Sequence, residues 1–247
     1  KDIKPNILCL EDLKLDDNEI EQCFDHLGVR PSDEPKYDLD NLKQATNLGS
    51  LMIPHSSQSE VINVLSKFKE IPSNSDAFLE HNLTCLKRGL LQLQFLAKKY
   101  DCVVDNPPYM GSGNMNGQLF DFVKTNYPDS KSDLMACFME TGLNALKPHG
   151  FLAMINQHSW MFISSYTRLR NKLIRSSFID TLLHLGARTF PEIGGEVVQS
   201  AAFTLLNSQL PQKIGISIKL TEFNRSSLKE NKFLDAINNE SSKWHFR

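Results

Sequence analysis

One short string, Asn106-Pro107-Pro108-Tyr109, combines residue types that can bind a planar ring carrying an amino group. The two prolines remove two backbone donors, so the chain has to leave a sheet at this point, and their rings stiffen the loop. The Asn106 side-chain oxygen and the Pro107 carbonyl are then two acceptors at a fixed spacing beside an aromatic ring. This arrangement predicts a socket for an NH2 group on a flat ring.

A strand is expected directly before this loop, because residues 100–105 are rich in apolar and β-branched types and stop abruptly at the prolines. In an open α/β sheet, ligands bind where the strands reach their carboxyl ends. The sequence therefore places the loop at the binding edge of a sheet.

Helices and strands are expected to alternate through the middle of the chain. Apolar spacing predicts helices over residues 58–70, 78–98, 133–146 and 165–177, and strands over 6–10, 100–105, 151–155 and 178–185. Two more strands, 197–206 and 214–220, have only a turn between them, which predicts an antiparallel hairpin at the sheet edge. The alternation in the middle of the chain predicts an α/β fold whose sheet contains parallel strands.

Composition describes an ordinary globular chain, with 40% apolar and 23% charged residues among 247. No apolar run is long enough to span a membrane. The cysteines and histidines are scattered without the spacing of a metal site, so we expect no metal, reduced thiols and a cytoplasmic protein. The net charge is −2, whereas a domain that binds DNA alone is usually basic.

The loop resembles motif IV of the amino-methyltransferases that use S-adenosylmethionine. Residues 129–134, 147–155 and 184–191 are similar to motifs V, VI and VIII of the same family. In that family the exocyclic amine bonds to the Asn oxygen and to the Pro carbonyl, which frees its lone pair for attack on the methyl group. The base has to be flipped out of the duplex to reach such a socket.

The resemblance also implies roles for single residues. It makes Asn106, Pro107, Pro108 and Tyr109 the catalytic loop, with Tyr109 and Phe190 stacking on the flipped base. It also implies contacts to the cofactor from Asp12, Glu11 and Asn106. Asp12 matches the acidic residue that ends the motif III strand better than Glu11 does.

Longer strings narrow the resemblance. Residues 106–116, 159–162 and 194–199 are similar to the large adenine-specific DNA methyltransferases of BREX phage-defence systems. Those proteins are relatives of the single-chain restriction–modification enzymes of type IIG. The resemblance implies an N6-adenine methyltransferase that acts at specific sites in double-stranded DNA, with other defence-system subunits as further partners.

The chain departs from the family in one respect. None of its 12 glycines forms the glycine-rich turn of motif I, which holds S-adenosylmethionine, at the right place. We therefore expect a fragment that lacks motif I and the target-recognition domain, and that is inactive alone. Residues 1–13 and 100–222 would form part of a Rossmann-like catalytic domain, residues 14–99 a mainly helical insertion, and residues 223–247 a linker or the start of a following domain.

Other functions fit the same socket. Methyltransferases that modify glutamine side chains of proteins or guanine amines of RNA carry the same four residues, although they lack long insertions. A non-catalytic subunit that binds DNA or serves as a scaffold is a third reading. Intact Asn106 and Tyr109 argue against that reading, and the missing motif I leaves it open.

Overall fold

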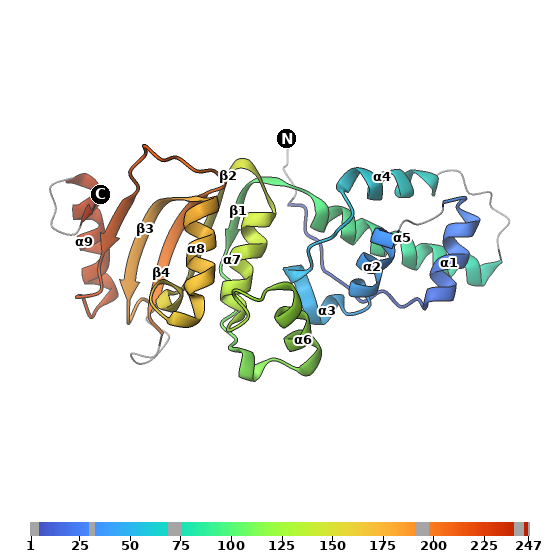
Figure 1. Cartoon of the computed structure of the whole chain (residues 1–247), viewed down its shortest axis with the longest axis horizontal. Coiled ribbons are helices and arrows are strands. Elements are labelled where there is room, and N and C mark those ends of the chain that lie inside the picture. The colour runs from blue at the N-terminus through green and yellow to red at the C-terminus, as the bar shows by residue number, and fades with distance from the viewer. Residues whose placement is uncertain (1–4, 30–32, 69–75, 191–197, 240–244, 247) are drawn as a thin grey trace. The chain divides into compact units, whose positions relative to one another are not determined.

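A computed structural model describes residues 5–29, 33–68, 76–190, 198–239 and 245–246 of the chain. The chain folds into two compact units, Lys1–Lys98 and Lys99–Arg247, which are coloured blue to teal and green to red in Figure 1. In the described segments, no helix combines the length and the apolar character that crossing a membrane requires.

The Lys1–Lys98 unit is helical and is built around one long helix, α5 (Ala77–Ala97). The helices α1 (Asp17–His26), α2 (Asp33–Leu42) and α4 (Gln58–Lys67) all contact α5. Between them lie the short elements α3 (Ala45–Leu48) and η1 (Gly49–Leu51). The expected helices at 58–70 and 78–98 are thus confirmed as α4 and α5.

The strand expected at residues 6–10 is wrong. Residues 5–16 have no regular secondary structure, and Ile7 is 79% exposed. An apolar run becomes a strand only where another strand supplies hydrogen-bond partners. No described strand of this unit does so, since every described element between residues 17 and 97 is helical.

The Lys99–Arg247 unit contains a six-stranded sheet in the order β1-β2-β4-β3-β5-β6. The strands are β1 (Tyr100–Asp105), β2 (Leu146–Gln157), β3 (Phe178–Gly186), β4 (Ser200–Leu206), β5 (Ile216–Lys219) and β6 (His245–Phe246). β1 is parallel to β2, and β3 is parallel to β5. β4 is antiparallel to both β2 and β3. The carboxyl ends of β1, β2 and β3 therefore lie along one edge of the sheet, which we call the carboxyl edge.

The expected edge hairpin at 197–220 is wrong. β4 lies inside the sheet between β2 and β3, and β5 pairs with the other side of β3. The chain between β4 and β5 therefore crosses β3 instead of turning back on itself. Gly215 permits this crossing, because a Cβ there would lie 2.1 Å from the Ile179 carbonyl oxygen. Local turn residues predict where a chain bends, but not which strand it joins next.

Helices cover one face of this sheet. The main cluster of buried side chains joins α7 (Leu134–Asn144) and α8 (Thr167–Ser176) to β2 and β4, and includes Met139, Leu152 and Phe203 (Figure 1). α6 (Gly117–Asn126) precedes α7. The short turns η2 (Ser112–Asn114), η3 (His158–Met161) and η4 (Ser164–Tyr166) complete the connections.

The opposite face of the sheet is only partly covered, by α9 (Ser226–Asn238), which packs near β3 and β5. A groove of about 620 Å³ runs along this face. Its lining is almost entirely apolar, and Val104 of β1 is 77% exposed. A sheet with parallel strands usually has both faces covered, so this face has the character of an interior surface.

Candidate active site

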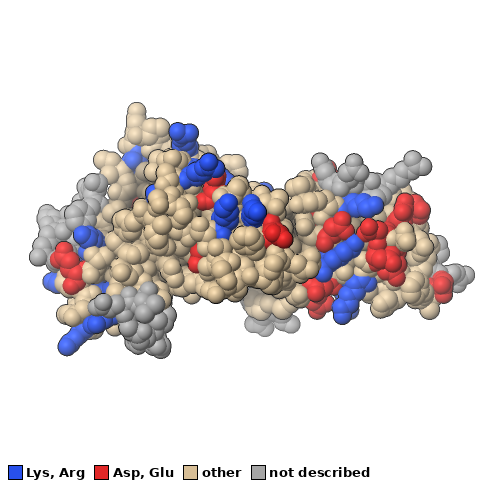
Figure 2. All heavy atoms as spheres, turned by 60° about the horizontal axis from the view of Figure 1, so that its bottom comes forward, with Lys and Arg blue, Asp and Glu red and all other residues tan. Residues whose placement is uncertain are grey.

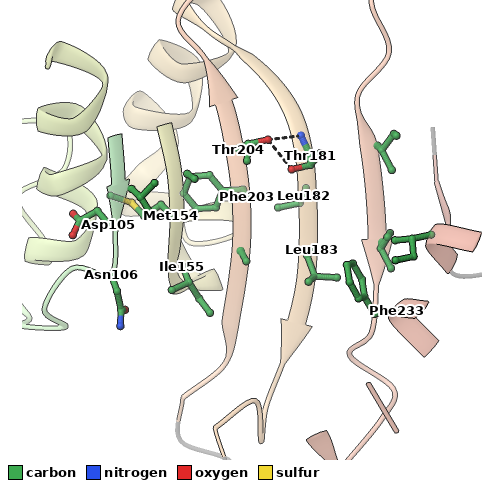
Figure 3. A pocket seen from close by; sticks show the side chains of 16 residues that line it. Asp105, Asn106, Met154, Ile155, Thr181, Leu182, Leu183, Phe203, Thr204 and Phe233 are labelled. Carbon is green, nitrogen blue, oxygen red and sulfur yellow. Dashed lines mark hydrogen bonds between the residues drawn. The ribbon is translucent and has the colours of Figure 1, made fainter. Parts of the chain in front are cut away.

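The Asn106–Tyr109 loop leaves the sheet at the end of β1, as the sequence predicts. The Asn106 side chain is exposed and extends beyond the last residue of the strand, while Asp105 points away from β2 (Figure 3). Pro107 is buried and Pro108 is exposed. The amide of Asn106 is therefore accessible at the carboxyl edge.

The first turn of α7 holds the backbone that follows Tyr109. The Asp133 carboxylate caps α7 by accepting from the Met135 N–H at 3.0 Å, and it also accepts from the Met110 N–H at 3.2 Å. Met110 returns the contact, because its carbonyl accepts from the Leu134 N–H at 3.0 Å. A helix cap thus fixes the catalytic-loop candidate to the core of the same unit.

Two carboxyl groups beside the loop are perturbed. Burial raises the pKa of Asp105, and the Asn106 backbone N–H opposes this. Burial likewise raises the pKa of Asp133 against the Met135 and Met110 N–H groups. The sequence reasoning assigned no role to either residue. Two features of the sequence could have indicated them: Asp105 is an acidic residue at the end of a strand, and Asp133 is one at the start of a helix.

The Tyr109 ring packs against the main core cluster, and only part of the residue is exposed. Its hydroxyl is buried. Burial raises the pKa of Tyr109, the nearby Asp133 charge adds to the increase, and the Ser200 hydroxyl opposes it. The core therefore limits the ring on one side and leaves part of the residue accessible, while the buried hydroxyl has no hydrogen-bond partner among the described residues.

Phe190 follows β3 and is half-buried. Because β2 and β4 lie between β1 and β3, the carboxyl ends of β1 and β3 are three strand spacings apart, about 14 Å. Lys229 of α9 donates hydrogen bonds to the carbonyls of Leu185 and Ala187 and so holds the chain that leads to Phe190. The segments that carry Asn106 and Phe190 thus both lie at the carboxyl edge, with β2 and β4 between them.

The two acidic residues expected at the cofactor, Glu11 and Asp12, belong to the Lys1–Lys98 unit. One carboxylate oxygen of Asp12 accepts from the Thr46 backbone N–H at 2.8 Å and from its hydroxyl at 2.9 Å. The backbone bond from Thr46 is the main reason why the pKa of Asp12 is lowered. Both acids line a pocket of about 440 Å³ within their own unit, together with Arg88. They and the Asn106–Tyr109 loop belong to different units.

A histidine pair at the carboxyl edge was not anticipated. Nδ1 of His158, just after β2, lies 2.8 Å from Nε2 of His184 on β3. The Phe162 ring contacts both imidazoles, with centroids 5.3 and 5.6 Å away, and is 60% exposed. Burial, with His158 as the next cause, lowers the pKa of His184 to about 4. Spacing along the chain gave no signal, because 26 residues separate the two rings.

Charge is distributed unevenly between the two units. In the printed sequence, Lys1–Lys98 carries 11 basic and 16 acidic residues, a formal charge of −5, and Lys99–Arg247 carries 16 basic and 13 acidic residues, a formal charge of +3. On the face shown in Figure 2, red and blue side chains interleave over the first unit. The unit with the Asn106–Tyr109 loop is therefore the basic one.

The sequence matches a known family over most of its length. Residues 13–190 match the family described as Eco57I restriction-modification methylase. This range includes β1, the Asn106–Tyr109 loop, α7, β2, α8 and β3.

Two curated relatives are similar to the chain. It is 38% identical over 195 residues to the adenine-specific methyltransferase BrxX of Escherichia coli O9:H4 (strain HS), which covers 78% of this chain and 16% of that protein. It is 44% identical over 161 residues to the adenine-specific methyltransferase PglX of Lacticaseibacillus casei (strain Zhang), covering 65% of this chain and 13% of that protein. The chain thus spans less than a fifth of either relative.

Among solved structures, the chain is similar to the methyltransferase subunit of a type I restriction-modification system from Streptococcus thermophilus. The TM-score is 0.41, the sequences are 16% identical, and the match covers 67% of this chain and 41% of that one.

Proposed function

The chain belongs to the Eco57I restriction-modification methylase family, and on that premise we propose that it forms the amine-binding half of a site-specific DNA adenine N6-methyltransferase. Its setting would be a phage-defence or restriction–modification system, as for the relatives named adenine-specific methyltransferases. The observation that carries the proposal is the Asn106–Tyr109 loop, exposed at the carboxyl edge and fixed to α7 through Asp133.

In this proposal the Asn106 side-chain oxygen and the Pro107 carbonyl accept hydrogen bonds from the two N–H bonds of the adenine amine. An aryl amine is a poor nucleophile because its lone pair is delocalised into the ring. Two acceptors fixed in advance draw the nitrogen toward tetrahedral geometry and localise that lone pair. The loop needs no strong base for this step, and Pro108 contributes by stiffening it.

The flipped adenine would stack on the Tyr109 ring, with Phe190 as a second aromatic contact. A base in a duplex cannot reach the carboxyl edge of a sheet, so extrusion is required. The half-buried state of both aromatic residues supports this role, since each has part of its surface available. The histidine pair with Phe162 lies along the same edge and would border the base or its neighbouring nucleotides.

S-adenosylmethionine, when bound, would supply the electrophilic methyl group. The chain fits the amine side of this reaction better than the cofactor side, because its glycines do not form a turn between a strand and a helix that could cradle the cofactor. Asn106 could contact both the adenine amine and the cofactor. Asp12 and Glu11 stay predicted cofactor contacts, and their position on a pocket wall is the observation that favours them.

The division of the chain stays a proposal as well. Residues 1–13 and 100–222 would belong to the catalytic domain, residues 14–99 would be an insertion, and residues 223–247 would be a linker. The basic charge of the Lys99–Arg247 unit supports contact with DNA phosphates. Other defence-system subunits and a cytoplasmic location complete the proposal.

The experiment that tests the function uses the full-length protein and S-adenosylmethionine with a labelled methyl group. Duplex DNA, RNA and total protein are offered as separate substrates, and the labelled product is identified. We expect N6-methyladenine in DNA and no labelled RNA or protein. Asn106→Ala should abolish labelling while DNA affinity stays within about twofold, because the lost acceptor acts on the amine and not on the phosphates.

Asn126→Ala is the matched control, since Asn126 is an exposed asparagine of the same unit at the end of α6. It should methylate DNA at the parent rate. A label on protein glutamine or on RNA guanine would mean that the substrate is one of these alternatives and not DNA adenine. A parent protein that binds DNA and labels nothing would favour the non-catalytic subunit.

A further inference from the structure

Two buried hydroxyls stand out in the described part of the chain. Among the buried side-chain nitrogen and oxygen atoms there, only the Tyr109 hydroxyl and the Ser200 Oγ have no hydrogen-bond partner. Native folds rarely leave such groups unpaired, because a buried hydroxyl without a partner destabilises the folded state. That both belong to one region of the carboxyl edge calls for a common explanation.

The two hydroxyls are neighbours. The Ser200 hydroxyl lowers the pKa of the Tyr109 phenol, against the opposing effects of burial and of the Asp133 charge. Both oxygen atoms are buried at the carboxyl edge, one in the loop that follows β1 and the other at the start of β4. Each hydroxyl can rotate its proton freely, so a small shift of either side chain suffices for one to donate and the other to accept.

Ser200 is well placed to hold a ring. It is fully buried and is the first residue of β4, where it pairs with Gln157 at the end of β2 and with Gly186 at the end of β3. The Tyr109 hydroxyl therefore reaches past β2 to the start of β4, so the contact joins two strand ends that share no ladder hydrogen bonds.

The other contacts of the loop fix its backbone and leave the ring free to tilt. Asp133 holds the Met110 N–H, and Leu134 holds the Met110 carbonyl. Packing against the core limits the ring on one side. Its hydroxyl is the one polar atom through which the ring plane can be set.

We propose that Ser200 is a positioning residue for Tyr109, and that a hydrogen bond between their hydroxyls sets the plane on which the target base stacks. Ser200 acts through Tyr109 and touches neither the base nor the methyl group. This role rests on the proposed function. Ser200 would thus contribute to base recognition, although the residues beside it in the sequence do not predict such a role.

The first test measures thermal unfolding of the full-length protein and of Ser200→Ala, Tyr109→Phe and the double variant. If the hydroxyls pair, each single variant leaves the other hydroxyl buried without a partner, so each lowers the Tm. The double variant removes both and should recover most of the loss. Single variants that leave the Tm unchanged or raise it, or losses that simply add, would overturn the proposal.

The second test measures methyl transfer at limiting and saturating substrate. Ser200→Ala and Tyr109→Phe should each lower kcat/KM by about five- to tenfold, and the double variant should be no worse than either. Ser200→Thr keeps the hydroxyl and should restore most of the activity. An active Ser200→Ala protein, or a double variant in which the two losses multiply, contradicts the proposal.

Thr204→Val is the control, because it removes a hydroxyl from the same strand, β4. The Thr204 hydroxyl lies 2.6 Å from the Thr181 hydroxyl and has no part in the proposed contact with Tyr109. It should lower the Tm without changing kcat/KM. If the parent labels RNA or protein in place of DNA, the proposed function fails, yet the same variants assayed on that substrate still decide the role of Ser200. The unfolding measurements decide it with no substrate at all.

Discussion

At the scale of single residues, the candidate site consists of groups whose freedom has been removed by their neighbours. Pro107 and Pro108 stiffen the backbone directly after Asn106, Asp133 fixes the Met110 backbone, and the core limits the Tyr109 ring on one side. A weak nucleophile such as an aryl amine gains most from acceptors that do not need to reorganise. The rigidity of the loop is therefore the property that suits it to the proposed chemistry.

The histidine pair leads to a prediction about pH. The pKa of His184 is about 4 in the folded state, below the 6.5 of a free histidine, because of burial and the neighbouring His158, Lys219 and Lys229. The unfolded chain therefore binds a proton below pH 6.5 that the folded chain refuses until about pH 4. Stability from this group is complete above pH 6.5 and is lost as the pH falls toward 4.

Thermal unfolding between pH 7.5 and 4 checks this. His184→Gln should flatten the fall of Tm with decreasing pH, whereas His26→Gln, an exposed histidine at the end of α1, should leave the curve as it is. Parallel curves for the parent and His184→Gln would show that the pair does not control acid stability.

At the scale of elements, the position of the loop depends on how closely α7 lies on β2. Gly142 of α7 faces Leu152 of β2, and a Cβ at Gly142 would lie 2.7 Å from Leu152 Cδ1. Leu152 is fully buried, so it has no free space into which to move. A glycine on the packed side of α7 thus sets the distance between the helix that holds the loop and the strand beside it.

Gly142→Ala should therefore destabilise the fold by about 1–3 kcal/mol through overpacking. Gly117→Ala is the matched change: Gly117 is the first residue of α6, nothing lies within 4 Å of its added Cβ, and stability should rise by roughly 0.5–1 kcal/mol. Chemical denaturation of the two variants measures both effects. Equal effects of the two substitutions would argue against close packing at Gly142.

At the scale of the whole molecule, one face of the sheet combines an apolar groove with an exposed edge strand. The groove runs from Val104 on β1 and from Asn106, just after it, to Phe233 on α9. Leu183 and Phe233 point toward one another within it (Figure 3). Such a surface resembles an interior more than an outer face.

We predict that the 247-residue chain alone neither binds S-adenosylmethionine tightly nor methylates DNA. The reason is the absence of a glycine-rich turn from its sequence. Calorimetry with the chain at high concentration checks the first statement, and the full-length protein is the positive control. Micromolar affinity of the isolated chain would mean that its own residues suffice to hold the cofactor.

Local sequence information was sufficient for the loop and for most elements around it. The prolines after Asp105 force the chain out of the sheet whatever surrounds them, and the apolar spacing of α4, α5, α7 and α8 repeats within a few turns. These features depend on neighbours in the chain, so the sequence determined them. The family resemblance carried by the Asn106–Tyr109 loop and by residues 184–199 was likewise legible from residue types alone.

Tertiary structure decided everything that depends on partners distant in the chain. Ile7 and its neighbours are apolar yet form no strand, because a strand requires a second strand that no periodicity can specify. β4 lies between β2 and β3, and β5 pairs with the far side of β3, where Gly215 allows a close approach to the Ile179 carbonyl. The pair His158–His184 forms for the same reason: packing, and not spacing along the chain, brings the two imidazole nitrogens together.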